Sequence, residues 1–172
     1  MQAEGRAPLK SSRVIRARRL FIVLATSVFA LDLISKNWAE GYLKFREPIK
    51  VIGEFLKLDY STNSGAAFSL FTDATLLLSS LKLAVVGFLI FYIRNVTNSR
   101  WAATLGILLG GVVGNLYDRA VRPPGFWRGE VVDWIVLPNW PTFNIADSAI
   151  VISVILMTLL TILDIPPKEP NE

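Results

Sequence analysis

Residues 74–93 read ATLLLSSLKLAVVGFLIFYI, an apolar stretch in which Lys82 is the only charged side chain. A helix of this length rises about 30 Å, which is roughly the thickness of the hydrocarbon core of a bilayer. It also satisfies its own backbone hydrogen bonds, as any chain that crosses lipid must. The stretch therefore predicts a transmembrane helix and argues against a water-soluble globule.

Three further apolar runs, at residues 20–39, 101–117 and 146–165, have a similar length and contain no proline. Together the four runs predict an all-α membrane protein with four transmembrane helices, forming a single domain over residues 1–172. A cleaved signal peptide is the alternative for residues 20–39, because basic residues precede this run and small residues lie near Ala25–Ala30. Its apolar character continues past that point, and three more spans follow.

The basic residues suggest how these spans are oriented. Six of them lie in a basic arm over residues 1–19, and Arg94 and Arg100 lie in the link between the second and third spans. Since basic flanks stay in the cytoplasm, we expect both termini and this link there, with residues 40–73 and 118–145 outside. Residues 40–73 carry four basic residues of their own, so the expectation depends on the N-terminal cluster. The net charge of +4 fits membrane lipid rather than nucleic acid, because the charge lies beside a span.

Segments typical of β-strands occur within residues 40–73. The sequences VIGEFLKLDYS at 51–61 and AAFSLF at 66–71 are rich in β-branched and aromatic residues. We therefore expect a small extracytoplasmic β element between the first and second helices, lying on the outer membrane surface.

Gly106, Gly110 and Gly114 recur every four residues, on one face of the predicted third helix. Small residues at this spacing allow helices to approach closely in a membrane. We expect these glycines to serve packing and no chemistry.

Polar side chains gather where the predicted spans reach the outer surface. Ionisable groups at membrane depth are costly and usually functional. Some also have a structural interpretation, because Asp32 and Lys36 are spaced as a helical ion pair and Asn144 could cap the last helix. Asp118 and Arg119 could likewise mark only the end of the third span. The candidates are Asp32, Lys36, Asn115, Asp118, Arg119, Asp133, Asn144 and Asp147.

The chain has no His and no Cys, which excludes imidazole and thiol catalysis. A pair of carboxylates can still hydrolyse a peptide bond, because two close acids share one proton and divide the roles of acid and base. Asp133 and Asp147 are candidates, since a loop can fold back onto the start of the fourth span. Composition and topology do not separate Asp118 from Asp133. Arg119 beside Asp118 would favour the ionised form, which is a poorer proton donor.

Five stretches, in order along the chain, resemble the bacterial lipoprotein signal peptidase family, also called signal peptidase II. The similarity covers residues 20–165, and the stretches are individually weak but specific as a set. The matching stretches are Leu31-Asp32 with Lys36, NSGAAF at 63–68, GGVVGNLYDR at 110–119, VVD at 131–133 and FNIADSAI at 143–150. The segment RPPGFWRGE at 122–130 is longer than the family's usual link before VVD.

The resemblance implies an aspartyl endopeptidase of the bacterial cytoplasmic (inner) membrane, with its active site near the outer face. It would cut diacylglyceryl-modified prolipoproteins just before the lipidated Cys, without a metal or other cofactor and without an obligate protein partner. The family's catalytic dyad falls on Asp133 and Asp147, with Asp118 in support. Positions that line the site for substrate or globomycin-type inhibitors fall on Asp32, Lys36, Asn63, Gly65, Asn115, Arg119 and Asn144.

Two other classes of function fit some of these residues. Ser79 and Ser80 lie near Lys82, so a Ser-Lys peptidase is one alternative, although Lys82 lies deep for a site at the outer surface. A four-span scaffold or ion carrier, with the acids as relay groups, is the other. Loss of cleavage on replacing Asp147 would separate the first alternative from the dyad, and ion flux without proteolysis would indicate the second.

Overall fold

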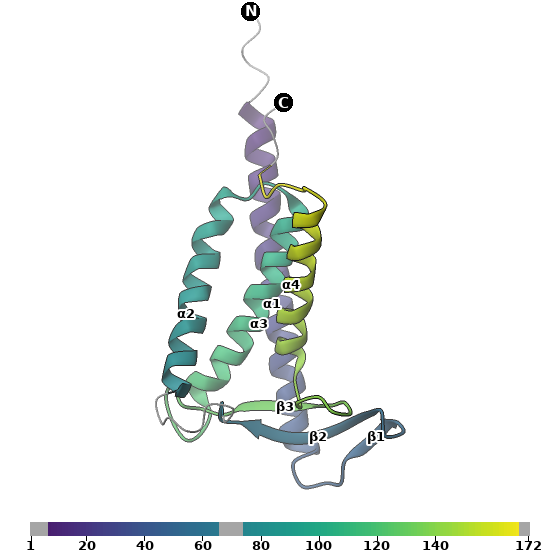
Figure 1. The fold of residues 1–172 in the computed structure, drawn as a ribbon. Coiled ribbons are helices and arrows are strands. Elements are labelled where there is room, and N and C mark those ends of the chain that lie inside the picture. Colours follow the sequence, from purple (N-terminus) through teal and green to yellow (C-terminus); the bar gives the residue numbers. More distant parts are fainter. Residues whose placement is uncertain (1–6, 66–73, 169–172) are drawn as a thin grey trace, which may run out of the picture.

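The computed structural model describes residues 7–65 and 74–168, with side chains from 12 and from 76 onward in the two segments. Within them, four long helices form a bundle and three strands form a sheet across one of its ends (Figure 1). The elements are α1 (Ala7–Tyr42), β1 (Ile49–Ile52), β2 (Leu56–Asn63), α2 (Ala74–Tyr92), the short 3-10 helix η2 (Ile93–Asn95), α3 (Ser99–Val121), β3 (Val131–Val136) and α4 (Ile145–Ile162).

The four helices coincide with the four predicted spans, but α1 is much longer than expected. It has 36 residues and includes much of the predicted basic arm, which is therefore helical from Ala7 onward. Among the described residues, Leu76–Asn95 and Ile145–Ile162 are long and apolar enough to cross a membrane. The polar cluster interrupts the apolar pattern of α1 and α3, so their crossing of the membrane stays a prediction.

The predicted close packing around α3 is present. A Cβ atom on Gly110 would lie 2.6 Å from the carbonyl oxygen of Ala25 in α1. One on Gly111 would lie 2.6 Å from the carbonyl oxygen of Ala146 in α4, and Gly106 faces α1 in the same way. Because real Cβ atoms do not come this close, α3 can sit against both neighbours only with glycine at these positions.

The outer faces of the helices are apolar, and the bundle interior near the sheet is polar. Leu77 on α2, Ile34 on α1 and Ile162 on α4 are each at least 66% exposed. Asp32, Lys36 and other charged groups are buried instead. This arrangement is inverted relative to a water-soluble protein and matches a helix bundle whose outer faces meet lipid.

The sheet is antiparallel in the order β1-β2-β3. The predicted strand at 51–61 corresponds to parts of β1 and β2, and the one predicted at 66–71 lies outside the described residues. The sequence analysis missed β3, which belongs to the segment between the third and fourth helices. Thr62 pairs with Val132, and Ser61 pairs with Asp133. Since neighbouring residues of a strand face opposite sides, the side chains of Val132 and Asp133 lie on different faces of the sheet.

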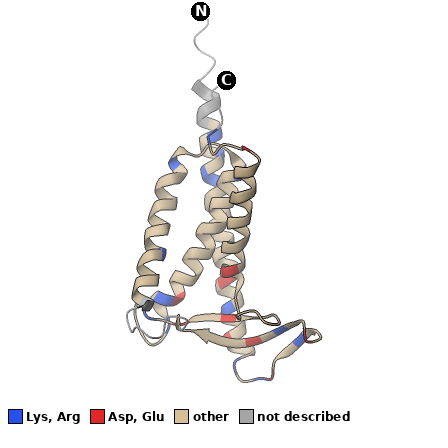
Figure 2. Ribbon diagram, viewed as in Figure 1, with Lys and Arg blue, Asp and Glu red and all other residues tan. Residues whose placement is uncertain are grey.

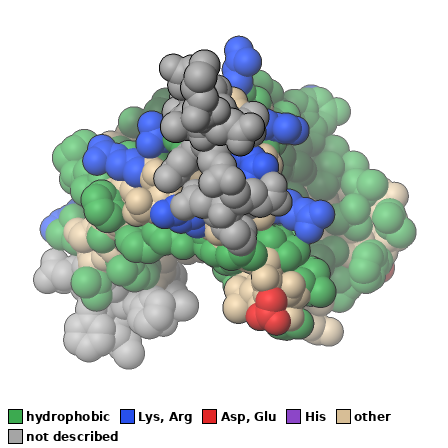
Figure 3. Space-filling model, turned by 90° about the horizontal axis from the view of Figure 1, so that it is seen from above, with side chains coloured by type: hydrophobic (Ala, Val, Ile, Leu, Met, Phe, Trp, Pro, Cys, Tyr) green, Lys and Arg blue, Asp and Glu red, His purple; other side chains and the backbone are tan. Residues whose placement is uncertain are grey.

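The two ends of the bundle differ in charge. The start of α1 and the end of α4 lie at the end opposite the sheet, where basic side chains gather (Figures 1 and 2). Seen along the bundle from this end, the basic side chains form a ring (Figure 3). Most acidic groups of the bundle lie near the sheet (Figure 2).

Candidate active site

A buried lysine lies at the centre of the polar cluster. The Nζ of Lys36 is 2.7 Å from Asp32 and 2.8 Å from Asp118, and it donates a hydrogen bond of 3.0 Å to Oδ1 of Asn115. The predicted ion pair between Asp32 and Lys36 is thus confirmed, and Lys36 has no exposed surface. Oδ1 of Asp32 also accepts the backbone N–H of Ala146 at 2.9 Å, which satisfies an amide at the start of α4.

Asp118 has two cationic partners, and Arg119 is not one of them. Besides Lys36, it accepts a bond of 2.7 Å from Nε of Arg122. Arg122 in turn pairs with Glu40 of α1. Arg119 points elsewhere and donates to the carbonyl oxygen of Gly129 at 2.9 Å. The ion pairs of Asp118 are therefore with Lys36 and Arg122 rather than with the neighbouring arginine.

Asn144 caps α4 and also reaches Asp133. Its Oδ1 accepts the backbone N–H of Asp147 at 2.9 Å, and Oδ2 of Asp147 accepts the backbone N–H of Asn144, which completes a capping box. The structural interpretation of this pair is thus correct. The Nδ2 of Asn144 donates to Oδ1 of Asp133 at 2.6 Å, so the same side chain also ties β3 to α4.

A second amide completes the connection between the two candidate acids. Nδ2 of Asn115 donates to Oδ1 of Asp147 at 2.7 Å, and Oδ1 of Asn115 accepts from Nδ2 of Asn144 at 3.2 Å. Asp133 and Asp147 are therefore joined through two hydrogen-bonded amides from α3 and α4. The sequence predicts that these residues lie together at the outer ends of the spans, and in the structure hydrogen bonds join them in one network.

The two pairs of acids differ in their partners. Asp32 and Asp118 are neutralised by cations, whereas Asp133 and Asp147 form no ion pair within the described residues. Burial and the negative charge of Asp147 raise the pKa of Asp133 to about 6, against weaker opposing effects of hydrogen bonds from Asn144 and Asn63. Asp133 can therefore hold or release a proton near neutral pH.

Asn63 and Gly65 lie at the end of β2, at the edge of this cluster. The backbone N–H of Gly65 donates to Oδ1 of Asn63 at 2.8 Å, and Gly65 has φ +86°. This turn requires the left-handed backbone that glycine adopts without strain. Asn63 is exposed, so its side chain is accessible from outside the bundle.

The Ser-Lys alternative finds no matching geometry. The Oγ of Ser79 donates to the carbonyl oxygen of Trp127 at 3.1 Å. Lys82 forms no hydrogen bond or ion pair with any residue that the structure describes. A base must lie within hydrogen-bond reach of its nucleophile, and these two residues are not so joined. Among the described residues there is also no group of three acidic side chains that could hold a metal ion.

Comparison with known proteins agrees with the resemblance. Residues 24–163 match the family model described as signal peptidase (SPase) II. The chain belongs to the signal peptidase II family. Lipoprotein signal peptidases from Rhodococcus jostii and Mycobacterium avium are each 40% identical to this family member, over 150 and 147 residues. These alignments cover 87% and 86% of this chain, and 76% and 81% of the two relatives.

The fold of this signal peptidase II family member is also shared with solved structures. Two structures described as bacterial membrane enzymes superpose on it with TM-scores of 0.73 and 0.75, at 26% and 27% sequence identity. The matched regions cover 88% and 84% of this chain and 93% of each solved chain. Family membership and the apolar helices together indicate a peptidase that is an integral membrane protein.

Proposed function

We propose that this chain is a lipoprotein signal peptidase in which Asp133 and Asp147 form an aspartyl dyad. One observation supports the assignment most strongly: these two acids of the cluster lack a cationic partner within the described residues, and two amides join them. The raised pKa of Asp133 fits a pair that shares one proton. The dyad would activate one water, with one acid accepting its proton and the other donating to the scissile carbonyl.

The surrounding polar groups then have a positioning role. Lys36 and Asp118 are fully buried. Lys36 donates to the side chain of Asn115, and Asp118 pairs with Lys36, so both residues act through that amide rather than by touching substrate. Asp32 holds the first turn of α4, which carries Asp147. Rigid support of this kind keeps catalytic groups within the small tolerance that proton transfer allows.

Substrate contacts are assigned to the edge of the cluster. Asn63, at the exposed end of β2, and Arg119, next to the 122–130 segment, would hold the substrate backbone. Gly65 would line the site beside Asn63. Asn144 would orient the dyad. Globomycin-type inhibitors would occupy the same position as the substrate.

The substrate would be a diacylglyceryl-modified prolipoprotein, cut just before its lipidated Cys. Its signal peptide would enter from the lipid between helices, and the acyl chains would stay in the bilayer. We place the sheet and the dyad at the outer face of the bacterial cytoplasmic membrane. Both ends of the chain would then lie in the cytoplasm, where the basic ring meets anionic lipid (Figure 3).

The test is a gel-shift cleavage assay with the purified protein in detergent and a chelator. The account predicts cleavage of the diacylglyceryl-modified prolipoprotein and little or none of its unmodified form. Equal cleavage of both forms would contradict the proposed substrate. No cleavage of either, from folded protein, would contradict the proposed activity.

A further inference from the structure

Lys82 is the basic residue within the apolar stretch of α2, and the mechanism above does not use it. It lies eight residues into α2, so its Cα is about 12 Å along the helix axis from the start of α2. A lysine at this depth costs roughly 3 kcal/mol or more, so it requires an explanation.

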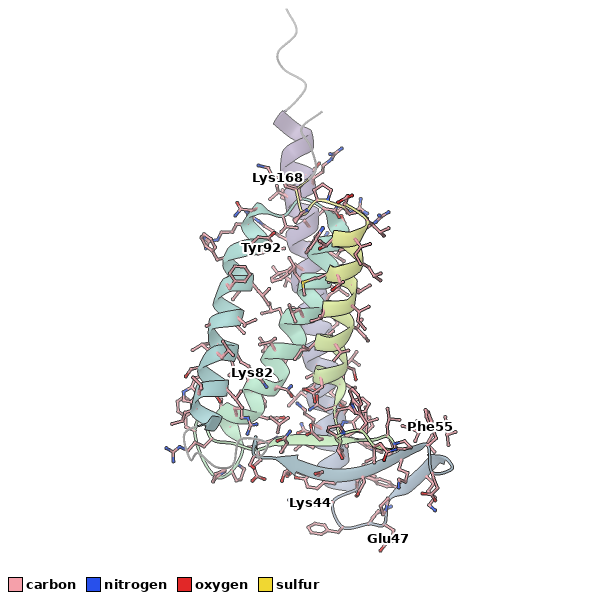
Figure 4. All side chains as sticks on the ribbon, in the orientation of Figure 1. Lys44, Glu47, Phe55, Lys82, Tyr92 and Lys168 are labelled. Atoms are coloured by element: carbon pink, nitrogen blue, oxygen red, sulfur yellow. The ribbon has the colours of Figure 1, made fainter. Side chains whose placement is uncertain are left out.

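The side chain faces the interior of the bundle. Ser79, Leu89 and Ile93 are the buried residues of this segment, and Lys82 is half-buried on the same helical stripe. Leu81 and Leu83 beside it are at least 50% exposed. Figure 4 shows the lysine extending from α2 toward α3. It therefore points away from the surrounding lipid.

The ammonium group lies in the field of the active site but is not bound to it. Both acids of the dyad and two cations, Arg119 and Lys36, act on it electrostatically. Lys82 forms no ion pair or hydrogen bond with a described residue. An ammonium group has three N–H donors with which to bind a ligand.

Depth separates Lys82 from the dyad. Asp147 is only two residues from the start of α4, whereas Lys82 is eight residues from the start of α2. Both helices start at the sheet end of the bundle (Figure 1). Lys82 therefore lies further along its helix from the sheet end than Asp147 lies along α4.

This depth matches a feature that every signal-peptide helix has. The last four carbonyl groups of a helix lack partners inside the helix, and they form the negative end of its dipole. In lipid no water is present to satisfy them. If the bond cut by the dyad follows the end of that helix, its last turn lies further from the sheet end than the dyad, on the side where Lys82 lies.

We propose that Lys82 binds the free carbonyl groups in the last turn of the substrate's signal-peptide helix. This inference rests on the proposed function for its substrate. Lys82 is then a binding residue that recognises the backbone of the signal peptide, whatever side chains the signal peptide carries. The position of α2 agrees: α2 packs against α3 and has little contact with α4, so we place the substrate helix on the α4 side of α2.

The test uses a synthetic signal peptide that ends in a carboxamide just before the position of the lipidated Cys. This peptide has no bond to cut, so its binding does not depend on catalysis. We expect Lys82→Met to weaken its binding by about tenfold to a hundredfold, the range of a charge-assisted hydrogen bond. Lys82→Arg should retain most of the binding. The exposed Lys50→Met is the matched control and should bind as the wild type does.

Cleavage kinetics of the same variants complete the test. A rise in KM for Lys82→Met with nearly constant kcat supports the proposal. Unchanged peptide binding by folded Lys82→Met overturns it, and so does a loss of kcat at constant KM in both Lys82 variants, which would indicate a role in proton transfer. Failure of the wild type to cleave the lipid-modified prolipoprotein would contradict the proposed function, while the peptide-binding result would still report on Lys82.

Discussion

Replacing Lys36 with methionine is the sharpest test of the buried network. Lys36 has no exposed surface and neutralises two buried carboxylates at 2.7 and 2.8 Å, those of Asp32 and Asp118. Methionine fills a similar volume but leaves both acids without this cation. Removing one partner of a buried ion pair costs about 3–5 kcal/mol. For a chain of this size, that lowers the unfolding temperature by about 6–20 °C.

Loss of Lys36 should make Asp32 and Asp118 destabilising to different degrees. Asp118 keeps Arg122 at 2.7 Å, whereas Asp32 keeps only the backbone N–H of Ala146. In the Lys36→Met background, Asp32→Asn should therefore restore more stability than Asp118→Asn does. This order follows from the partners that remain and from no other feature of the fold.

The assay is thermal unfolding of the purified protein in detergent, followed by circular dichroism. Lys50→Met is the control, because that lysine is 60% exposed and its pair with Glu54 lies at the surface. It should change the free energy of unfolding by less than about 0.5 kcal/mol. The reasoning is refuted if Lys36→Met unfolds within two or so degrees of the wild type.

Three further predictions concern the dyad and the helix packing. Because the pKa of Asp133 is raised from 3.8 to about 6, ionisation of this carboxyl destabilises the folded state as pH rises through this window. Asp133→Asn should therefore raise the free energy of unfolding by about 3 kcal/mol at pH 7.5 and by far less at pH 4. Equal shifts in unfolding temperature at the two pH values would contradict this. Asn144→Ser keeps a cap on α4 but loses the amide donor to Asp133. The cleavage rate should fall at least about tenfold, with a small change in unfolding temperature. Unimpaired cleavage would exclude a role of Asn144 in orienting Asp133. Gly110→Ala should destabilise by about 1–3 kcal/mol, while the open position Gly87→Ala should not, and similar unfolding of both variants would argue against the close packing of α1 on α3.

The sequence was sufficient to predict the helices because each contains an apolar run that is long enough to cross a membrane and has no proline. It did not predict β3, since residues 131–136 are a short segment whose partner, β2, lies far away in the chain. Pairing between such distant segments leaves no local pattern. The length of α1 was also underestimated, because its basic residues mark the edge of the membrane and do not end a helix.

The candidate site was predicted in its members but not in its connections. Helical spacing was enough for the Asp32–Lys36 pair and for the cap by Asn144. Asp118 and Arg122 have the same spacing, although their pairing was not predicted. No spacing rule could show that Asp118 also pairs with Lys36, because Lys36 comes from another helix. The distinction between Asp118 and Asp133 thus depends on tertiary contacts.

The role of the dyad is tested most directly by cleavage of a diacylglyceryl-modified prolipoprotein, with wild type, Asp133→Asn and Asp147→Asn compared in detergent with a chelator. Asp164→Asn, an exposed acid at the far end of α4, is the control. The account predicts that each dyad variant remains folded and loses at least about a hundredfold in rate, as expected for loss of a general acid or base, while the control cleaves normally. Cleavage at the wild-type rate by either dyad variant would contradict it.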